Sequence, residues 1–268
     1  IPYYNGTSWG YVNSDGDMVL SPVYEEATAF SGDYAVVRLD GTYTLIDKQG
    51  NWYAVDKSGL DKVTGICGNR IIAVKNNEYA VCSYDFNIIS EKFDEAYISS
   101  NEIVTAKKNG KWALINAADG SAVTDYIYDE VVLNSHNEVF AGKYGVVKDS
   151  QGYFVIDSTG KELNGVRYPG AKGFEGTYYA VSDSQGRWGY ADPSGEIAIA
   201  CQYDDAFSFS DNVGAVKKDG AWNYINSKGQ LVIEADFERA HPFTNGYTFV
   251  TVSGEEKLIS FTYYKSFE

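Results

Sequence analysis

The chain has 268 residues, of which 44% are hydrophobic and 15% aromatic, so it can fill a core and is not a disordered polypeptide. Its formal net charge of −15 argues against nucleic acid or an anionic membrane surface as a partner, because both attract basic proteins. The 23 tyrosines, 13 phenylalanines and 27 glycines favour strands and tight turns over helices.

A repeat of about 34 residues runs along the chain. When the sequence is aligned on a strand of the Trp-Gly-Tyr type, copies begin at Trp9, Tyr43, Tyr79, Trp112, Tyr153, Trp188 and Trp222, with a degenerate copy at Glu256. The spacing stays between 33 and 41 residues. This regularity predicts a single repeat domain over residues 1–268.

Each copy predicts the same elements in the same order. The Trp-Gly-Tyr strand is followed by a turn with glycine in third place, as in Pro193-Ser194-Gly195, and by a short apolar strand such as 197–200. An aromatic-acid-acid-alanine step comes next, then a phenylalanine corner, then a strand of small residues such as 214–218. The small residue after each leading aromatic, such as Gly189, predicts a neighbouring unit packed close behind.

These features resemble the WG-repeat family of bacterial proteins. The resemblance covers essentially the whole chain, is closest at 9–41, 187–220 and 221–254, and weakens at 54–70 and 157–173, where the acidic step is lost. The resemblance implies a β-propeller-like repeat protein with no assigned chemistry.

We therefore expect an all-β propeller of about seven or eight short-stranded blades, with an open β-solenoid as the alternative. The Trp-Gly-Tyr strand should be the third strand of a blade and the small-residue strand the second. Segments 1–13 and 248–267 should complete a shared blade. Four tryptophans of the repeat should be buried and Trp52, outside the pattern, more exposed; the four are Trp9, Trp112, Trp188 and Trp222.

Catalytic and metal-binding patterns are missing from the sequence. There are two histidines, His136 and His241, and three cysteines without a Cys-x-x-Cys motif. No phosphate-binding loop occurs. Paired carboxylates recur in most copies, whereas the catalytic pair of a glycosidase should be unique. The sequence predicts a protein that is not an enzyme and that uses no metal or other cofactor.

Two sets of residues are candidates for binding. If the copies are related by rotation, the acidic steps would form an anionic arc that could dock a basic partner or cations. The alternative is that these acids cap turns. The acids of this set are Glu25, Glu26, Asp94, Glu95, Asp129, Glu130, Asp204 and Asp205. The second set lies at 133–143, where the array breaks its own period, and comprises Asn134, His136 and Asn137.

We expect a binding scaffold whose partner is a protein or a peptide, and the acidic steps would allow this partner to be basic. The alternative is a carbohydrate-binding module at a bacterial cell surface that uses exposed tyrosines. The tyrosines that lie outside the alternation are Tyr3, Tyr4, Tyr53, Tyr84, Tyr97, Tyr263 and Tyr264. No apolar stretch reaches the 18 residues of a membrane span, and an extracellular or cell-surface location is expected.

Overall fold

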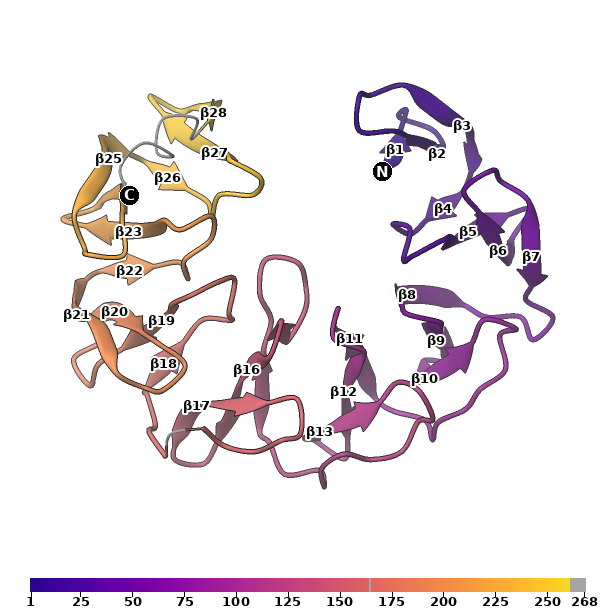
Figure 1. Ribbon diagram of the computed structural model, residues 1–268, viewed down its shortest axis with the longest axis horizontal. Coiled ribbons are helices and arrows are strands. Elements are labelled where there is room, and N and C mark those ends of the chain that lie inside the picture. Colours follow the sequence, from indigo (N-terminus) through magenta and orange to yellow (C-terminus); the bar gives the residue numbers. More distant parts are fainter. Residues whose placement is uncertain (164, 261–268) are drawn as a thin grey trace. The chain divides into compact units, whose positions relative to one another are not determined.

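The computed structural model describes residues 1–163 and 165–260. Within these ranges every regular element is a β-strand, and the strands form eight antiparallel sheets of three or four strands that follow one another along the chain (Figure 1). This arrangement agrees with the predicted all-β fold of seven or eight blades. No helix in these ranges has the length and apolarity to cross a membrane.

The chain divides into two compact units, residues 1–127 and 128–268. The first unit contains four blades. They consist of β1 (Pro2–Tyr4), β2 (Trp9–Val12) and β3 (Met18–Tyr24); β4 (Glu26–Ala27), β5 (Tyr34–Leu39), β6 (Thr42–Asp47) and β7 (Trp52–Val55); β8 (Lys62–Cys67), β9 (Arg70–Lys75) and β10 (Glu78–Ser83); and β11 (Glu95–Ile98), β12 (Ile103–Lys108) and β13 (Lys111–Asn116).

The described part of the second unit also contains four blades. They consist of β14 (Glu130–Val132), β15 (Phe140–Ala141), β16 (Tyr144–Asp149) and β17 (Gly152–Asp157); β18 (Gly170–Ala171), β19 (Tyr179–Ser182), β20 (Trp188–Ala191) and β21 (Ile197–Tyr203); β22 (Asp205–Ala206), β23 (Gly214–Lys218), β24 (Ala221–Ile225) and β25 (Leu231–Phe237); and β26 (Arg239–Ala240), β27 (Tyr247–Val252) and β28 (Glu255–Ser260).

The predicted order of strands within a blade is confirmed. In the sheet β22-β23-β24-β25 the acidic step supplies the first strand, the small residues the second, the tryptophan strand the third and the return strand the fourth. A blade therefore joins the end of one repeat copy to the beginning of the next.

The glycine of the Trp-Gly-Tyr strand has a different role from the predicted one. Trp188 pairs with Tyr203 and Tyr190 pairs with Ile199, so the return strand β21 bulges opposite Gly189. A Cβ atom on Gly189 would lie 2.5 Å from the Ile199 carbonyl oxygen. The glycine is needed because the return strand of its own blade, not a neighbouring unit, approaches it.

Blades within one unit interlock through buried aromatic rings. Tyr190 of β20 is fully buried, and its ring lies 4.7 Å, centroid to centroid, from Phe209 at the corner of the next blade. Trp112 and Trp222 are buried as expected, whereas Trp9 and Trp188 are only half-buried. Trp52 is 63% exposed, which agrees with its place outside the repeat pattern.

The predicted shared terminal blade would join segments of the two units, and it stays a prediction. β1 belongs to the sheet β1-β2-β3, and β28 belongs to the sheet β26-β27-β28. Each of these terminal strands pairs with the strand next to it in sequence, β1 with β2 and β28 with β27. Residues 261–267 of the predicted shared blade lie outside the described residues.

Candidate functional site

The first acid of the acidic step accepts a hydrogen bond from the turn that joins the second and third strands of its blade. The Asp94 carboxylate accepts from the Asn109 N–H at 2.9 Å, and Glu25 accepts from the Gly41 N–H at 3.0 Å. Asn109 has a φ of 53°, which is the left-handed backbone conformation that two-residue hairpin turns of this kind require. Asp204 makes a longer contact of 3.4 Å to the Gly220 N–H. These acids act in turn formation, the alternative that the sequence left open.

The second acid begins a row of paired side chains across three strands. In each row an acid of the first strand pairs with a cation of the second, which pairs with the leading aromatic residue of the third. The rows are Glu26–Arg38–Tyr43, Glu95–Lys107–Trp112, Glu130–Lys148–Tyr153 and Asp205–Lys217–Trp222.

Hydrogen bonds and ring contacts hold these rows together. The Tyr43 hydroxyl donates to Glu26 at 2.8 Å, and Arg38 lies 5.5 Å from the centre of the Tyr43 ring. Burial, followed by the bond to Glu26, raises the pKa of Tyr43 to about 12. Lys148 likewise lies 4.8 Å from the centre of the Tyr153 ring and pairs with Glu130. The charge of Glu26 and Glu130 is thus balanced within each blade.

The other blades lack this row, and the blade β18–β21 is one of them. Gly170 and Ser182 occupy the acid and cation positions opposite Trp188. Lys172 instead places its ammonium group 4.8 Å from the centre of the Trp188 ring and 3.6 Å from the carboxylate of Asp205 in the next blade. Asp205, the second acid of the next blade, therefore has Lys172 as a cationic partner.

The inserted segment forms a turn inside the first strand of its blade. β14 and β15 both pair with β16, so the chain leaves this edge after Val132 and returns to it at Phe140. Phe140 is fully buried, and the spacing of Phe140 to Tyr144 matches that of Phe30 to Tyr34. Phe140 is therefore a phenylalanine corner that was not predicted. The Phe-x-Gly-x-Tyr pattern that it shares with Phe30 is the sequence signal for it.

The three candidate residues of this segment build its turn. The Asn134 side-chain oxygen accepts from the N–H groups of His136 and Glu138, and Asn137 has a φ of 60°. Glu175, whose side chain is only 6% exposed, fixes the turn from outside it by accepting from the Ser135 hydroxyl at 2.9 Å. Nothing in the sequence links Glu175 to this turn, because the two lie 40 residues apart.

Ser135, His136 and Glu175 do not form a catalytic triad. The same ring nitrogen of His136, Nδ1, lies 3.3 Å from the Ser135 hydroxyl and 3.5 Å from Glu175. A triad needs the two ring nitrogens to face the nucleophile and the acid separately. Within residues 1–163 and 165–260 no three His, Cys, Asp or Glu side chains are grouped to hold a metal ion.

An open groove of about 700 Å³ follows strand β7 in the first unit. Seven successive residues, 52–58, line one wall, and the turn residues Asp85, Phe86 and Asn87 line the other. Trp52 and Tyr53 are 63% and 59% exposed there. The Tyr53 ring packs against Tyr34 with 4.9 Å between ring centroids. The groove is thus lined by two exposed aromatic side chains and by polar side chains such as Asp85.

The far wall of this groove contains an unusual residue. Phe86 occupies the place of the turn glycine found in other copies, such as Gly229, and it has a φ of 59°. Bulky residues rarely adopt this left-handed conformation. Phe86 remains in it because its ring is buried in the cluster that includes Tyr43, Leu45 and Leu60.

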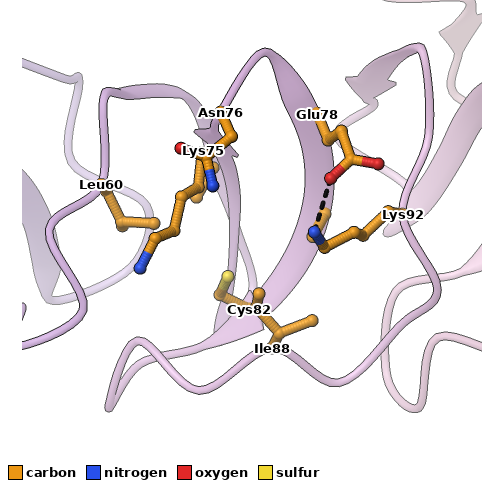
Figure 2. Close-up of a pocket in the computed structure, with 9 residues that line it drawn as sticks. Leu60, Lys75, Asn76, Glu78, Cys82, Ile88 and Lys92 are labelled. Carbon is orange, nitrogen blue, oxygen red and sulfur yellow. Dashed lines mark hydrogen bonds and ion pairs between the residues drawn. The ribbon is translucent and has the colours of Figure 1, made fainter.

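A smaller cavity of about 250 Å³ lies beside β9 and β10, and Figure 2 shows its labelled side chains. Lys92 pairs with Glu78, and Lys75 donates to the Ser58 carbonyl oxygen. Cys82 at its base is fully buried, and burial raises the pKa of its thiol to about 11. A thiol with so high a pKa stays protonated at neutral pH and is a poor nucleophile.

The tyrosines proposed to stack sugars have different environments. Tyr3, Tyr4 and Tyr53 are exposed. Tyr84 and Tyr97 are half-buried and donate hydrogen bonds to the Gly68 carbonyl oxygen and to Glu95. Tyr263 and Tyr264 lie outside the described residues. Of the five tyrosines of this set that the structure describes, Tyr53 alone lines the groove along β7.

The model of one protein family, described as the WG containing repeat, matches residues 9–43, 82–112, 188–222 and 222–255, which make up half of the chain. No curated protein matches the sequence.

Several solved structures are similar in fold. A eukaryotic initiation factor has a TM-score of 0.60 at 11% identity, with 93% of this chain and 77% of that chain covered. BamB from Moraxella catarrhalis has a TM-score of 0.54 at 12% identity, with 98% and 94% covered. The computationally designed Ika8 protein has a TM-score of 0.51 at 17% identity, with 87% and 82% covered. These likenesses concern the fold alone, which is that of β-propeller proteins.

Proposed function

We propose that this chain, which belongs to the WG containing repeat family, is a non-enzymatic scaffold that binds a protein or peptide. The observation that carries the proposal is the groove along β7 in the first unit, which the exposed side chains of Trp52 and Tyr53 line. Exposed aromatic residues in a concave site are typical of binding surfaces, where they contribute large contact areas at low entropic cost.

The polar groups near the groove support binding rather than catalysis. The Asp56 carboxylate accepts hydrogen bonds from the Leu60 N–H at 2.8 Å and from the Ser58 N–H and hydroxyl at 2.7 Å. These bonds help to keep the pKa of Asp56 low, against the effect of its burial. A carboxylate that is already satisfied in this way is a poor general base.

A selection experiment tests the proposal. A random peptide library is displayed to the immobilised wild-type protein, and a Trp52→Ser/Tyr53→Ser double variant serves as the counter-target. We expect peptides enriched on the wild type alone and recovered chemically unchanged by mass spectrometry. Failure to enrich any peptide, or equal enrichment on both proteins, would contradict the scaffold proposal. Cleavage or modification of a bound peptide would contradict its non-enzymatic part.

A carbohydrate is the second candidate ligand, because the exposed Trp52 and Tyr53 rings could also stack on a sugar. A glycan array probed with the same two proteins tests this candidate. Saturable binding of a glycan to the wild type and not to the double variant would favour it over the peptide.

A further inference from the structure

Strand β7 is the open edge of its sheet. In the order β4-β5-β6-β7 it is the last strand, and among the residues that the structure describes it pairs only with β6. The Asp56 N–H donates to the Tyr43 carbonyl oxygen at 2.8 Å, toward β6. Because backbone groups alternate in direction along a strand, the N–H and C=O groups of Val55 point away from β6.

The groove runs along this open edge. Neighbouring side chains of a strand point to opposite faces of the sheet, so a groove on one face would touch every second residue. The groove instead is lined by all of Trp52, Tyr53, Ala54 and Val55. A register shift against β6 at Tyr53 accounts for part of this departure from alternation, and the lining by both Ala54 and Val55 places the groove along the open edge of β7, where a further strand would lie.

Register shifts occur in the return strands of several blades. β3 contains Pro22 and a register shift against β2, and β21, β25 and β7 carry shifts without a proline. Proline and bulges are common ways of preventing a further strand from pairing. What distinguishes β7 is the groove along it, which the turn residues 85–87 also line.

We propose that the groove binds an extended peptide that adds to β7 as a fifth strand, with a basic side chain directed toward Asp85. The inference rests on the proposed scaffold function and specifies its partner. Main-chain bonds to Val55 supply the strand pairing, and the Trp52 and Tyr53 rings flank the peptide side chains. The ionisable residues that line the groove are Asp56, Lys57 and Asp85, which leave a net negative charge that favours a basic peptide.

Residue-resolved amide hydrogen exchange tests the added strand. The probe is a peptide enriched on the wild-type protein, and the reference is the same peptide with its central amide nitrogens methylated. We expect the unmethylated peptide to slow exchange at the Val55 amide and the methylated peptide to bind at least about tenfold more weakly, because it lacks the strand's donors. Unchanged exchange at Val55, or equal affinity of the two peptides, would overturn the inference.

Charge reversal tests the preference for a basic peptide. Asp85→Lys should weaken the binding of a peptide with one Arg or Lys by roughly twofold to fivefold, as expected for an exposed ion pair, and should not weaken a neutral peptide. Equal loss for both peptides would contradict the role of Asp85. If no peptide binds at all, the scaffold function itself fails; if peptides bind without protecting Val55, only the added strand fails. Displacement of the peptide by a glycan would assign the groove to carbohydrate.

Discussion

The hydroxyl group of Tyr190 donates a hydrogen bond to the carbonyl oxygen of Phe207, 17 residues further along the chain and 2.9 Å away. Two other blades repeat this bond at the same separation, from Tyr11 to Thr28 and from Tyr224 to His241. A buried tyrosine of one blade is thereby tied to the chain that leads into the next. The bond explains why tyrosine occupies the third position of the strand in these copies.

Tyr190→Phe should lower the free energy of unfolding by about 1–2 kcal/mol, because the partly buried Phe207 carbonyl loses its side-chain donor. The measurement is urea unfolding monitored by fluorescence. Tyr53→Phe is the matched control, since Tyr53 is exposed and its hydroxyl lies near water. Equal stability of Tyr190→Phe and wild type would show that the bond contributes nothing.

Gly189→Ala should destabilise the protein by about 1–3 kcal/mol through steric crowding, since the new Cβ meets the backbone of β21 and cannot move aside. The reverse exchange at a partly exposed position, Ala221→Gly in β24, should cost only about 0.5–1 kcal/mol from added backbone freedom. Thermal and urea unfolding of the two variants compare these costs. A Gly189→Ala protein as stable as wild type would contradict the bulge explanation.

Phe86→Gly should lower stability despite relieving backbone strain. Loss of a buried phenylalanine costs about 3–5 kcal/mol, whereas a left-handed residue stores about 1–3 kcal/mol. The ring is therefore the larger effect, and we expect a net loss on the order of 2 kcal/mol. Unfolding measurements on Phe86→Gly check the sign. A stabilised variant would show that the strain outweighs the packing.

Arg167→Met should destabilise the protein by about 1.5–3 kcal/mol at pH 7, because it removes charged hydrogen bonds to Asp149 and Glu162. The matched control, Arg187→Met, removes a more exposed pair with Asp183 and should destabilise the protein much less, because solvent screens this pair.

The Arg167 effect should depend on pH. The hydrogen bonds from Arg167 hold the pKa of both Asp149 and Glu162 below their ordinary values. Groups with a lowered folded pKa stabilise the protein fully above their unfolded pKa of about 4 and lose that contribution as the pH falls through the folded value. The difference between wild type and Arg167→Met should therefore shrink below about pH 4. A constant difference from pH 7 to pH 3 would contradict this linkage.

The repeat made much of the fold predictable from sequence. Alternation and glycine spacing predicted the strand order within each blade, because local geometry determines which residues can turn or pair. The bulge opposite Gly189 was not predictable, since it depends on the register of the return strand. The place of Trp52 outside the pattern was visible in the sequence, whereas the groove beside it was not, because its second wall comes from residues 85–87.

Loss of the pattern carried information about the candidate site. The copy over 54–70 lacks the acidic step, and in the structure this departure adjoins the groove. Phe86 occupies the turn position at which several copies have glycine, and this difference was also visible in the sequence. The predicted contact loop at Asn134, by contrast, is a hydrogen-bonded turn anchored by Glu175. The anchoring residue could be found only from the contact between distant parts of the chain, and the role of the segment in binding stays a prediction.

Calorimetric titration of a selected peptide into wild type, Trp52→Ala and Ile197→Ala tests the central claim, that this chain binds a peptide along β7. Ile197 is also an exposed apolar residue, at 44%, but it lies on the bulged strand β21. We expect saturable binding to wild type and Ile197→Ala, and at least about 20-fold weaker binding to Trp52→Ala, as for an aromatic residue that dominates an interface. Equal affinity of all three proteins, or no saturable binding to wild type, would contradict the claim.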